Sequence, residues 1–369
     1  MWTKTTDGSI LDKDGKVIYF STERFINDIC IDGCCFICGA KPGSKPFNNE
    51  HILPDWLLGE YGLYDRMITL PNGQKMRYGT YTVPCCVDCN TLMGREIEEP
   101  VSAVLKSGLT AINDFLVAGG LLKIYVWAGL IFLKTHLKDR LLRYHLDRRK
   151  GDALIADDYD WSDLHHIHCL VRSFYTNCEV APEVIGSFMS WPAAPYPEKF
   201  DFADLYLAQT MHLRLGETAL FFVFNDSGGG LMGIQPKLDR VAGPINPLQC
   251  RELMTDVAIV NLNIKERPVY QSDINLTTES YRIVARLPSQ FELNDIEQKQ
   301  KGQLMLHALN NVPEGVSFVG HTRASALAAI EAGVMTFLFD DDGKFIGQPF
   351  PDEQADTSAV SATGQAALG

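Results

Sequence analysis

Two pairs of closely spaced cysteines constrain this chain more than any other feature of its sequence. Cys35 and Cys38 form the first C-x-x-C pair, Cys86 and Cys89 form the second, and 47 residues separate them. Two such pairs supply the four thiolates of a tetrahedral zinc site, and a closed four-cysteine shell leaves no position for a substrate. We therefore predict one structural zinc ion that ties the two ends of the 47-residue insertion together.

Three neighbouring cysteines keep the choice of zinc ligands open. Cys34 and Cys85 adjoin the pairs and would serve if either pair were shifted by one position, and Cys30 is a further candidate at a poorer spacing. The chain holds 10 cysteines, and its first residues, MWTKTTDGSI, are polar and lack the apolar run of an export signal. We therefore expect metal-bound or free thiols rather than disulfides, and a cytoplasmic protein.

Candidate catalytic residues lie between and directly after the cysteines. Glu50 and His51 follow the first pair, and Asn90 comes directly after Cys89. The order C-x-x-C, acidic-His, C-x-x-C-Asn resembles the zinc-containing HNH (His-Me finger, ββα-metal) endonucleases over roughly residues 30–100. It is carried by the segments CFIC, EHILP and CVDCN.

The resemblance implies a fold and a chemistry. It implies a ββα unit in which His51 is the general base that activates water for phosphodiester hydrolysis. Glu50 and Asn90 would bind a catalytic magnesium or manganese ion through oxygen ligands. The expected partner is nucleic acid, with DNA preferred, and the expected setting is bacterial restriction or phage defence. Adjacent residues of a strand point in opposite directions, so Glu50 and His51 should sit at a strand end or a bend.

The sequence departs from the family pattern at the helix. No histidine or asparagine occupies the place of the third motif residue: Gly94 lies one turn after Asn90, and Glu98 two turns after it. Glu98 would reach the ion if the helix were displaced. The alternative function is a non-catalytic zinc module that binds nucleic acid or protein.

The charge distribution is compatible with a phosphate-binding surface in the N-terminal region. The formal net charge of the chain is −13, but residues 1–150 carry a balance of +2 and the remainder carries −15. A basic run follows the cysteine-containing region, and with Arg95 it forms the predicted nucleic-acid contact. Its members are Lys134, Lys138, Arg140, Arg143, Arg148, Arg149 and Lys150. A solvated outer helix face explains the run equally well.

The predicted fold class is α+β, with an HNH domain at residues 1–105, a mixed α+β domain at 106–350 and a disordered tail at 351–369. Hairpins are expected around Asp14-Gly15, Pro71-Asn72-Gly73 and Ser227-Gly228-Gly229-Gly230. We expect a helix that begins near Asn90 and stops at Pro100, a buried helix from Leu248 and a strand over YRIVARL.

An apolar stretch and a histidine cluster each have two explanations. Residues 115–133 approach the length of a membrane span, but Gly119-Gly120 should break them, so a buried helix is preferred over a membrane anchor. Leu130, Leu133, Leu137, Leu141 and Tyr144 share one helical face. His165, His166 and His168 could bind a second metal, although a packing role is favoured.

Overall fold

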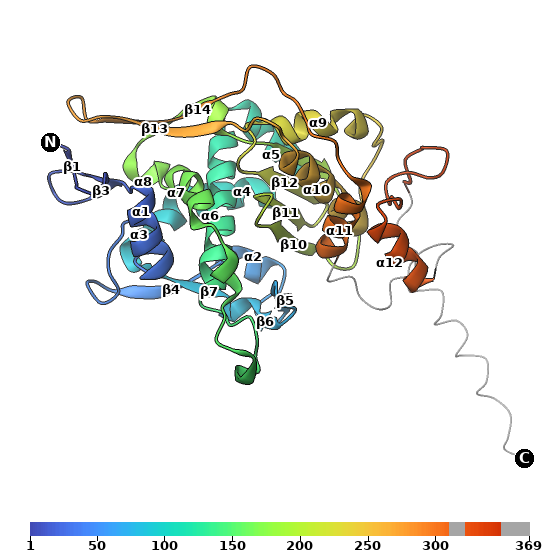
Figure 1. Cartoon of the computed structure of the whole chain (residues 1–369), viewed down its shortest axis with the longest axis horizontal. Helices are drawn as coiled ribbons and strands as arrows, with labels where there is room; N and C mark the ends of the chain where they lie inside the picture. Colours follow the sequence, from blue (N-terminus) through green and yellow to red (C-terminus); the bar gives the residue numbers. More distant parts are fainter. Residues whose placement is uncertain (310–321, 348–369) are drawn as a thin grey trace, which may run out of the picture.

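The computed structural model describes residues 1–309 and 322–347, and these form a mixed α+β structure (Figure 1). The predicted α+β class is therefore confirmed. The predicted disordered tail at 351–369 lies outside the described residues.

The cysteine-containing region is built on a pair of antiparallel strands followed by a helix. Strands β4 (Phe47–His51) and β7 (Thr82–Cys86) pair so that Phe47 faces Cys86 and His51 faces Thr82. Helix α3 (Val87–Met93) begins directly after β7. The segment between the two strands contains α2 (Asp55–Glu60), β5 (Met67–Thr69), β6 (Lys75–Arg77) and η2 (Tyr78–Thr80).

Two of the predicted hairpins form as expected. Strands β2 (Ile10–Leu11) and β3 (Val17–Tyr19) flank Asp14-Gly15, and β1 (Thr3–Lys4) completes their small sheet. Strands β5 and β6 pair around the Pro71-Asn72-Gly73 turn, where Gly73 has a φ of 77°. A positive φ suits glycine, which has no Cβ to clash.

The helix predicted from Asn90 to Pro100 extends beyond both of these residues. It starts at Val87, so Asn90 lies inside it rather than capping it, and it continues through the π-helical turn η3 (Gly94–Glu98) into α4 (Glu99–Lys106). Pro100 occupies the first turn of α4. Proline cannot donate the usual helical hydrogen bond, and it lies just after the π-helical turn, where the Glu99 N–H donates to the carbonyl of Gly94.

Two apolar helices meet at a sharp bend. Helices α5 (Leu109–Val117) and α6 (Leu121–Asp139) are bent by 119° at the predicted glycine break. Within the described residues no single helix is long and apolar enough to cross a membrane. Leu130, Leu133 and Leu137 are buried as predicted, but α6 ends before Leu141 and Tyr144, which are both exposed.

A four-stranded antiparallel sheet forms the centre of the C-terminal region. Its order is β10-β11-β12-β9, so β10 is an edge strand. The strands are β9 (Phe188–Pro192), β10 (Phe200–Leu205), β11 (Thr210–Leu215) and β12 (Thr218–Val223). Helix α10 (Pro247–Leu262) packs on β11 and β12, and a reciprocal capping box of Asn246 and Gln249 starts it. The predicted buried helix is thus confirmed.

The glycine-rich segment after β12 does not form the predicted hairpin. Helix α9 (Gly229–Leu238) follows instead. Asp226 accepts hydrogen bonds from the backbone N–H groups of Gly228 and Gly230, at 3.2 and 2.7 Å, and Ser187 Oγ accepts one from Leu231 at 2.8 Å. These acceptors satisfy N–H groups that a helix N-terminus leaves free, so the helix outcompetes a second strand.

A second sheet and the remaining helices surround this core. Strand β14 (Ser280–Arg286), predicted from YRIVARL, pairs with β13 (Val269–Asn275) and with the short β8 (Glu179–Val180). The other helical segments are α1 (Thr22–Arg24), η1 (Phe25–Ile31), η4 (Arg148–Lys150), η5 (Ile155–Asp158), η6 (Trp161–Leu164), α7 (His165–Val171), α8 (Ser173–Thr176), η7 (Pro182–Val184), α11 (Gln298–Ala308) and α12 (Arg323–Glu331).

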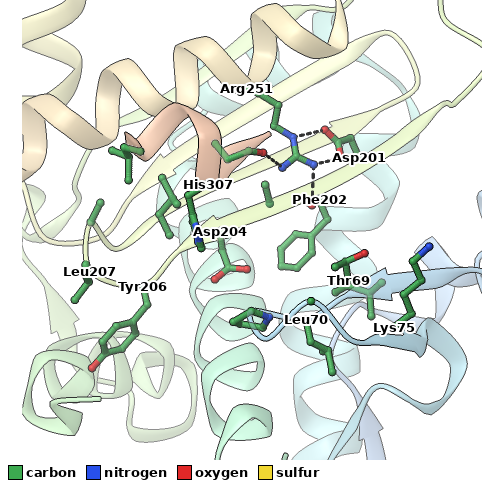
Figure 2. Close-up of a pocket in the computed structure, with 18 of the residues that line it drawn as sticks. Thr69, Leu70, Lys75, Asp201, Phe202, Asp204, Tyr206, Leu207, Arg251 and His307 are labelled. Atoms are coloured by element: carbon green, nitrogen blue, oxygen red, sulfur yellow. Dashed lines mark hydrogen bonds and ion pairs between the residues drawn. The ribbon is translucent and has the colours of Figure 1, made fainter. Parts of the chain in front are cut away.

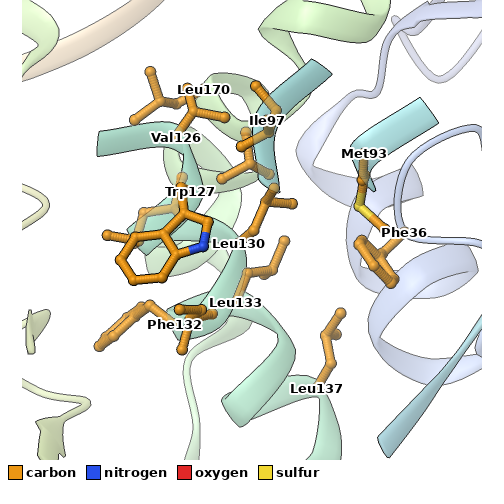
Figure 3. Packing of buried hydrophobic residues seen from close by; sticks show 14 of the residues in the cluster. Phe36, Met93, Ile97, Val126, Trp127, Leu130, Phe132, Leu133, Leu137 and Leu170 are labelled. Carbon is orange, nitrogen blue, oxygen red and sulfur yellow. The ribbon is translucent and has the colours of Figure 1, made fainter. Parts of the chain in front are cut away.

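One hydrophobic core runs across the predicted domain boundary at 105/106. Helix α6 lies at its centre, and Trp127, Leu133 and Leu137 pack among side chains of the cysteine-containing region such as Met93 and Ile97 (Figure 3). Because buried side chains from both regions belong to the same cluster, the boundary does not coincide with a gap in the core. Helix α6 is therefore part of the support for the candidate site.

Candidate functional site

The two C-x-x-C pairs converge on one point. The sulfur atoms of Cys35, Cys38, Cys86 and Cys89 all lie within 4.8 Å of one another. A zinc ion with Zn–S bonds of about 2.3 Å in a tetrahedron would separate its sulfurs by about 3.8 Å. The 3.6 Å separation of the Cys38 and Cys86 sulfurs is close to that value. The donor set and its spacing therefore fit a metal ion such as zinc.

The loop that carries the first pair has the conformation that such a site requires. Gly39 follows Cys38 with a φ of 74°, and its N–H donates to the carbonyl of Cys35 at 2.7 Å. A Cβ at Gly39 would lie 2.6 Å from the ring of Phe20. Glycine is thus required here by both the backbone conformation and the packing.

Two buried residues of the C-terminal region hold the same loop. His168 Nε2 lies 2.8 Å from the carbonyl oxygen of Phe36, and Arg172 Nε donates to that of Ile37 at 2.6 Å. Arg172 also donates to the carbonyls of Val17 and Ile18, so β3 is tied to the loop as well. Sequence reasoning missed Arg172, because the chain offers no local signal for a contact 135 positions away.

The geometry also decides among the alternative cysteines. Cys85 lies on β7 with its sulfur 3.8 Å from that of Cys35, but it does not belong to the group of four. Cys34 and Cys30 are buried elsewhere in the core, and burial raises the pKa of both thiols. The described residues therefore favour the predicted ligands over the shifted set.

His51 stands at the end of β4 with one ring nitrogen held by the backbone. Its Nε2 lies 3.3 Å from the carbonyl oxygen of Gly79, which accepts hydrogen bonds but cannot donate them. A hydrogen bond to that carbonyl places a proton on Nε2, and the neutral tautomer with this proton has its lone pair on Nδ1. Nδ1 lies 3.6 Å from Asp55 Oδ1, and the side chain of His51 is 27% exposed. Tyr64 donates to the same Asp55 oxygen at 2.5 Å.

Glu50 points the other way, into the protein. Its Oε1 accepts a hydrogen bond of 2.7 Å from Lys134 Nζ, and the side chains of Glu50 and Lys134 are only 9% and 1% exposed. Lys134 also donates to the carbonyl of His51 at 2.7 Å, and Glu98 Oε1 lies 3.9 Å from its Nζ. Burial raises the pKa of Glu98, while the positive charge of Lys134 opposes that shift.

This arrangement corrects one prediction and informs another. Lys134 was expected to contact phosphate, but its buried ammonium binds Glu50 instead, so that prediction is wrong. His51 is at a strand end as expected, yet Glu50 faces the interior rather than sharing the exposed side. Alternation along β4 explains the separation of their side chains. Glu98 ends the π-helical turn η3 and lies beside Lys134.

Asn90 was predicted to bind the catalytic ion and Arg95 to contact nucleic acid. Both lie on the helix formed by α3 and η3. Asn90 is half-buried in α3. Arg95 is exposed and forms an ion pair with Glu96, its neighbour, at 2.8 Å. Within residues 1–309 and 322–347, the four cysteines are the one group of three or more His, Cys, Asp or Glu side chains whose ligand atoms converge. Glu50 and Glu98 both lie beside the ammonium of Lys134, at 2.7 and 3.9 Å, which supplies the positive charge at this place in the structure.

The other side chains of the basic run do not share one surface, because α6 ends at Asp139. Lys138 is half-buried and Arg140 donates to the carbonyl of Ile31 at 2.8 Å, while Arg143 pairs with Asp152. Arg148, Arg149 and Lys150 lie beyond the helix and are exposed. The alternative explanation, one solvated outer helix face, therefore does not account for the run in this part of the described chain.

The three clustered histidines are packing residues. His165 Nε2 lies 2.8 Å from the carbonyl oxygen of Phe20, and His166 Nε2 lies 2.8 Å from that of Phe224. His168 contacts Phe36 in the same manner. Each ring uses a nitrogen on a different backbone group, which agrees with the packing explanation.

Comparison with known proteins gives no relative for this chain: no protein-family model, curated protein or solved structure matches it significantly. The argument about function therefore rests on the geometry of the site.

Proposed function

We propose that this chain is an HNH-type endonuclease that hydrolyses phosphodiester bonds in nucleic acid, with DNA as the expected substrate. The observation that carries the proposal is the position of His51. It ends the first strand of a strand–strand–helix unit beside a four-cysteine cluster, and its partly exposed ring faces the Gly79 carbonyl with Nε2 and Asp55 with Nδ1.

The proposed chemistry assigns a proton-transfer role to His51. Nδ1 of the neutral ring accepts a proton from the attacking water as the water oxygen bonds to phosphorus. The phosphorus–oxygen bond to the leaving sugar oxygen breaks, and that oxygen takes a proton from solvent. The resulting imidazolium then has protons on both nitrogens, one facing Gly79 and one facing the Asp55 carboxylate. Asp55, which Tyr64 orients, stabilises that cation. Asp55 is thus a positioning residue added to the set predicted from sequence.

A catalytic cation is the second part of the proposal. The family resemblance implies magnesium or manganese bound by Glu50 and Asn90, whereas in this structure Glu50 is paired with Lys134. Participation of the cation is an expectation that titration of magnesium and manganese against EDTA in a cleavage assay would test.

One observation favours the second candidate function, a non-catalytic zinc module. The positive charge beside Glu50 comes from Lys134, a side chain of the protein itself, and this ammonium is too deeply buried to reach a phosphate group. Such a module would bind nucleic acid or protein without cutting it. Binding that survives while cleavage is absent in every tested metal would favour this candidate.

The test compares two histidine substitutions in purified, zinc-containing protein. Plasmid DNA should be cut by the wild type, and His51→Ala should lower the rate by about 10²–10⁴-fold because a general base is lost. His145→Ala is the matched control, since His145 lies in the loop after α6, and it should cut at the wild-type rate. Equal rates for His51→Ala and the wild type would overturn the assignment, provided that contaminating nuclease is excluded.

The cleavage assay also identifies the substrate, and two further measurements check the fold of the variant. Single-stranded DNA and RNA are offered beside plasmid DNA, and preferential cleavage of RNA would correct the expected substrate. Circular dichroism and zinc content of His51→Ala should match the wild type, because the imidazole lies outside the sulfur cluster. A loss of either would point to misfolding rather than to a missing base.

A further inference from the structure

A large cavity lies along the free edge of the C-terminal sheet, away from the cysteines. Its volume is about 1210 Å³, which is ample for a small organic molecule. It is bounded by the edge strand β10, by the β5–β6 hairpin and by helices α10 and α11 (Figure 2). The walls thus come from segments that are more than a hundred residues apart in the chain.

Two ion pairs account for four of the charged residues that line this cavity. Arg251 forms two ionic hydrogen bonds with Asp201, at 2.8 and 2.5 Å, and Arg66 pairs with Glu198. The two members of each pair neutralise each other, so these pairs add little net charge to the wall of the cavity. They define the polar rim and fix α10 against β10.

Four acidic residues of the described chain line the cavity: Glu198 and Asp201 are paired with arginines and Asp158 is exposed, whereas Asp204 is the more buried one that has no arginine or lysine partner. Its side chain is 21% exposed, and within the described residues no lysine or arginine nitrogen lies within 4.0 Å of it. Its nearest basic neighbour is His136 of α6, whose Nε2 lies 3.5 Å from Asp204 Oδ2. Figure 2 shows the Asp204 carboxylate between the His307 and Leu70 sides of the cavity.

The surroundings of Asp204 leave its charge poorly compensated. His136 is 1% exposed, and neither of its ring nitrogens makes a hydrogen bond in the described structure. Asp139, on the far side of His136, adds a second carboxylate whose Oδ1 is also unpartnered. Burial raises the pKa of Asp204, His136 lowers it and Asp139 raises it again. A cation from outside would relieve this imbalance.

Beside the polar side chains of Thr69, Lys75, Gln300, Gln303 and His307, the lining contains an apolar and partly aromatic wall. Phe202 and Tyr206 flank Asp204 on the same strand and the following turn, and Ile259, Leu262 and Leu304 line the cavity from α10 and α11. Tyr206 stacks on Tyr159 with ring centroids 4.0 Å apart, which fixes its ring. An apolar wall with one convergent carboxylate is suited to an amphiphilic ligand.

We propose that this cavity binds a small organic cation, a molecule with a flat apolar body and a protonated amine or amidine group that pairs with Asp204. The ligand nitrogen donates to the carboxylate, while the apolar body lies against the aromatic and aliphatic wall. The proposal does not depend on nuclease activity, because it concerns a different surface of the molecule and a binding event alone.

The experiment uses three probes of almost the same shape and different charge. Benzamidine is cationic, benzamide is neutral and benzoate is anionic at neutral pH. Isothermal titration of the full chain should detect benzamidine binding, and benzamide and benzoate should bind at least about tenfold more weakly because a charged pair is lost. Equal binding of benzamide, or tighter binding of benzoate, would overturn the proposal without any variant.

Two matched substitutions then locate the site. Asp204→Asn keeps the shape of the side chain and should weaken benzamidine binding by about tenfold or more. Asp273→Asn, at an exposed acidic residue of β13 that does not line the cavity, should leave the affinity unchanged. Unaltered affinity in Asp204→Asn, with circular dichroism matching the wild type, would place the bound cation elsewhere and contradict the proposal.

Discussion

Single residues determine how the charge beside His51 is balanced. The Glu50–Lys134 pair is almost completely buried, and Lys134 also donates to the backbone of His51. Removing one member of a buried ion pair leaves the other charge desolvated, which costs more than the pair contributes. The pair therefore positions the end of β4 as well as neutralising Glu50.

The first prediction concerns this pair. Lys134→Met should lower the free energy of unfolding by about 3–5 kcal/mol, because Glu50 is left buried and unpaired. The double variant Lys134→Met/Glu50→Gln removes both charges and should recover a large part of that loss. Guanidinium denaturation at neutral pH measures both values. A double variant no more stable than Lys134→Met would show that Glu50 is not the group whose charge matters.

Among the elements, the loop after η1 and the start of α3 depend on the cysteine cluster. The loop carries Cys35 and Cys38. Cys86 ends β7 and Cys89 lies in the first turn of α3, so β4 and most of β7 lie between the two pairs in the chain. Because a metal ion would join segments about fifty residues apart, its removal should loosen both strands together. His51 and the Glu50–Lys134 pair stand on those strands.

The second prediction is that the purified chain contains about one zinc ion, and that Cys86→Ser/Cys89→Ser abolishes it. Structural zinc supplies roughly 10–16 kcal/mol of apparent folding energy in small peptides, so a chelator should also lower the melting temperature. Elemental analysis and thermal denaturation provide the measurements. Cys85→Ala is the control, because its sulfur adjoins the cluster without belonging to it. Zinc lost from Cys85→Ala but kept by the double variant would favour the shifted ligand set.

On the scale of the whole molecule, several histidines are buried in their neutral form. Burial lowers the pKa of His166 to about 4 and that of His212 to about 4, and it lowers the pKa of His168 further. The unfolded chain, with histidine pKa values near 6.5, binds more protons below that pH. Stability is therefore fully present above about pH 6.5 and is lost as the pH falls toward 4.

The third prediction follows from this linkage. The free energy of unfolding should decrease between about pH 6.5 and 4, and each such histidine adds about 1.4 kcal/mol per pH unit to the slope. His166→Gln retains a donor for the Phe224 carbonyl but cannot titrate, so its slope should be shallower by about one proton. Urea denaturation at several pH values gives the slope. Identical slopes in the two proteins would mean that His166 does not remain neutral in the fold.

The sequence by itself determined the features that depend on short spacing. The C-x-x-C pairs, the hairpins at Asp14-Gly15 and Pro71-Asn72-Gly73, the break before α6 and the helix that Asn246 caps were all predicted, because their residues interact within a few positions. Local backbone preferences and ligand spacing suffice for such contacts.

The tertiary structure alone decided which partners the site residues have. Lys134 meets Glu50 across 84 positions, and Arg172 reaches the cysteine loop across 135. The prediction of α9 as a hairpin failed for the same reason, since Ser187 satisfies an N–H group of that helix from 44 positions away. A buried charge or N–H group takes whichever acceptor the packed chain brings near it, and local sequence does not contain that information.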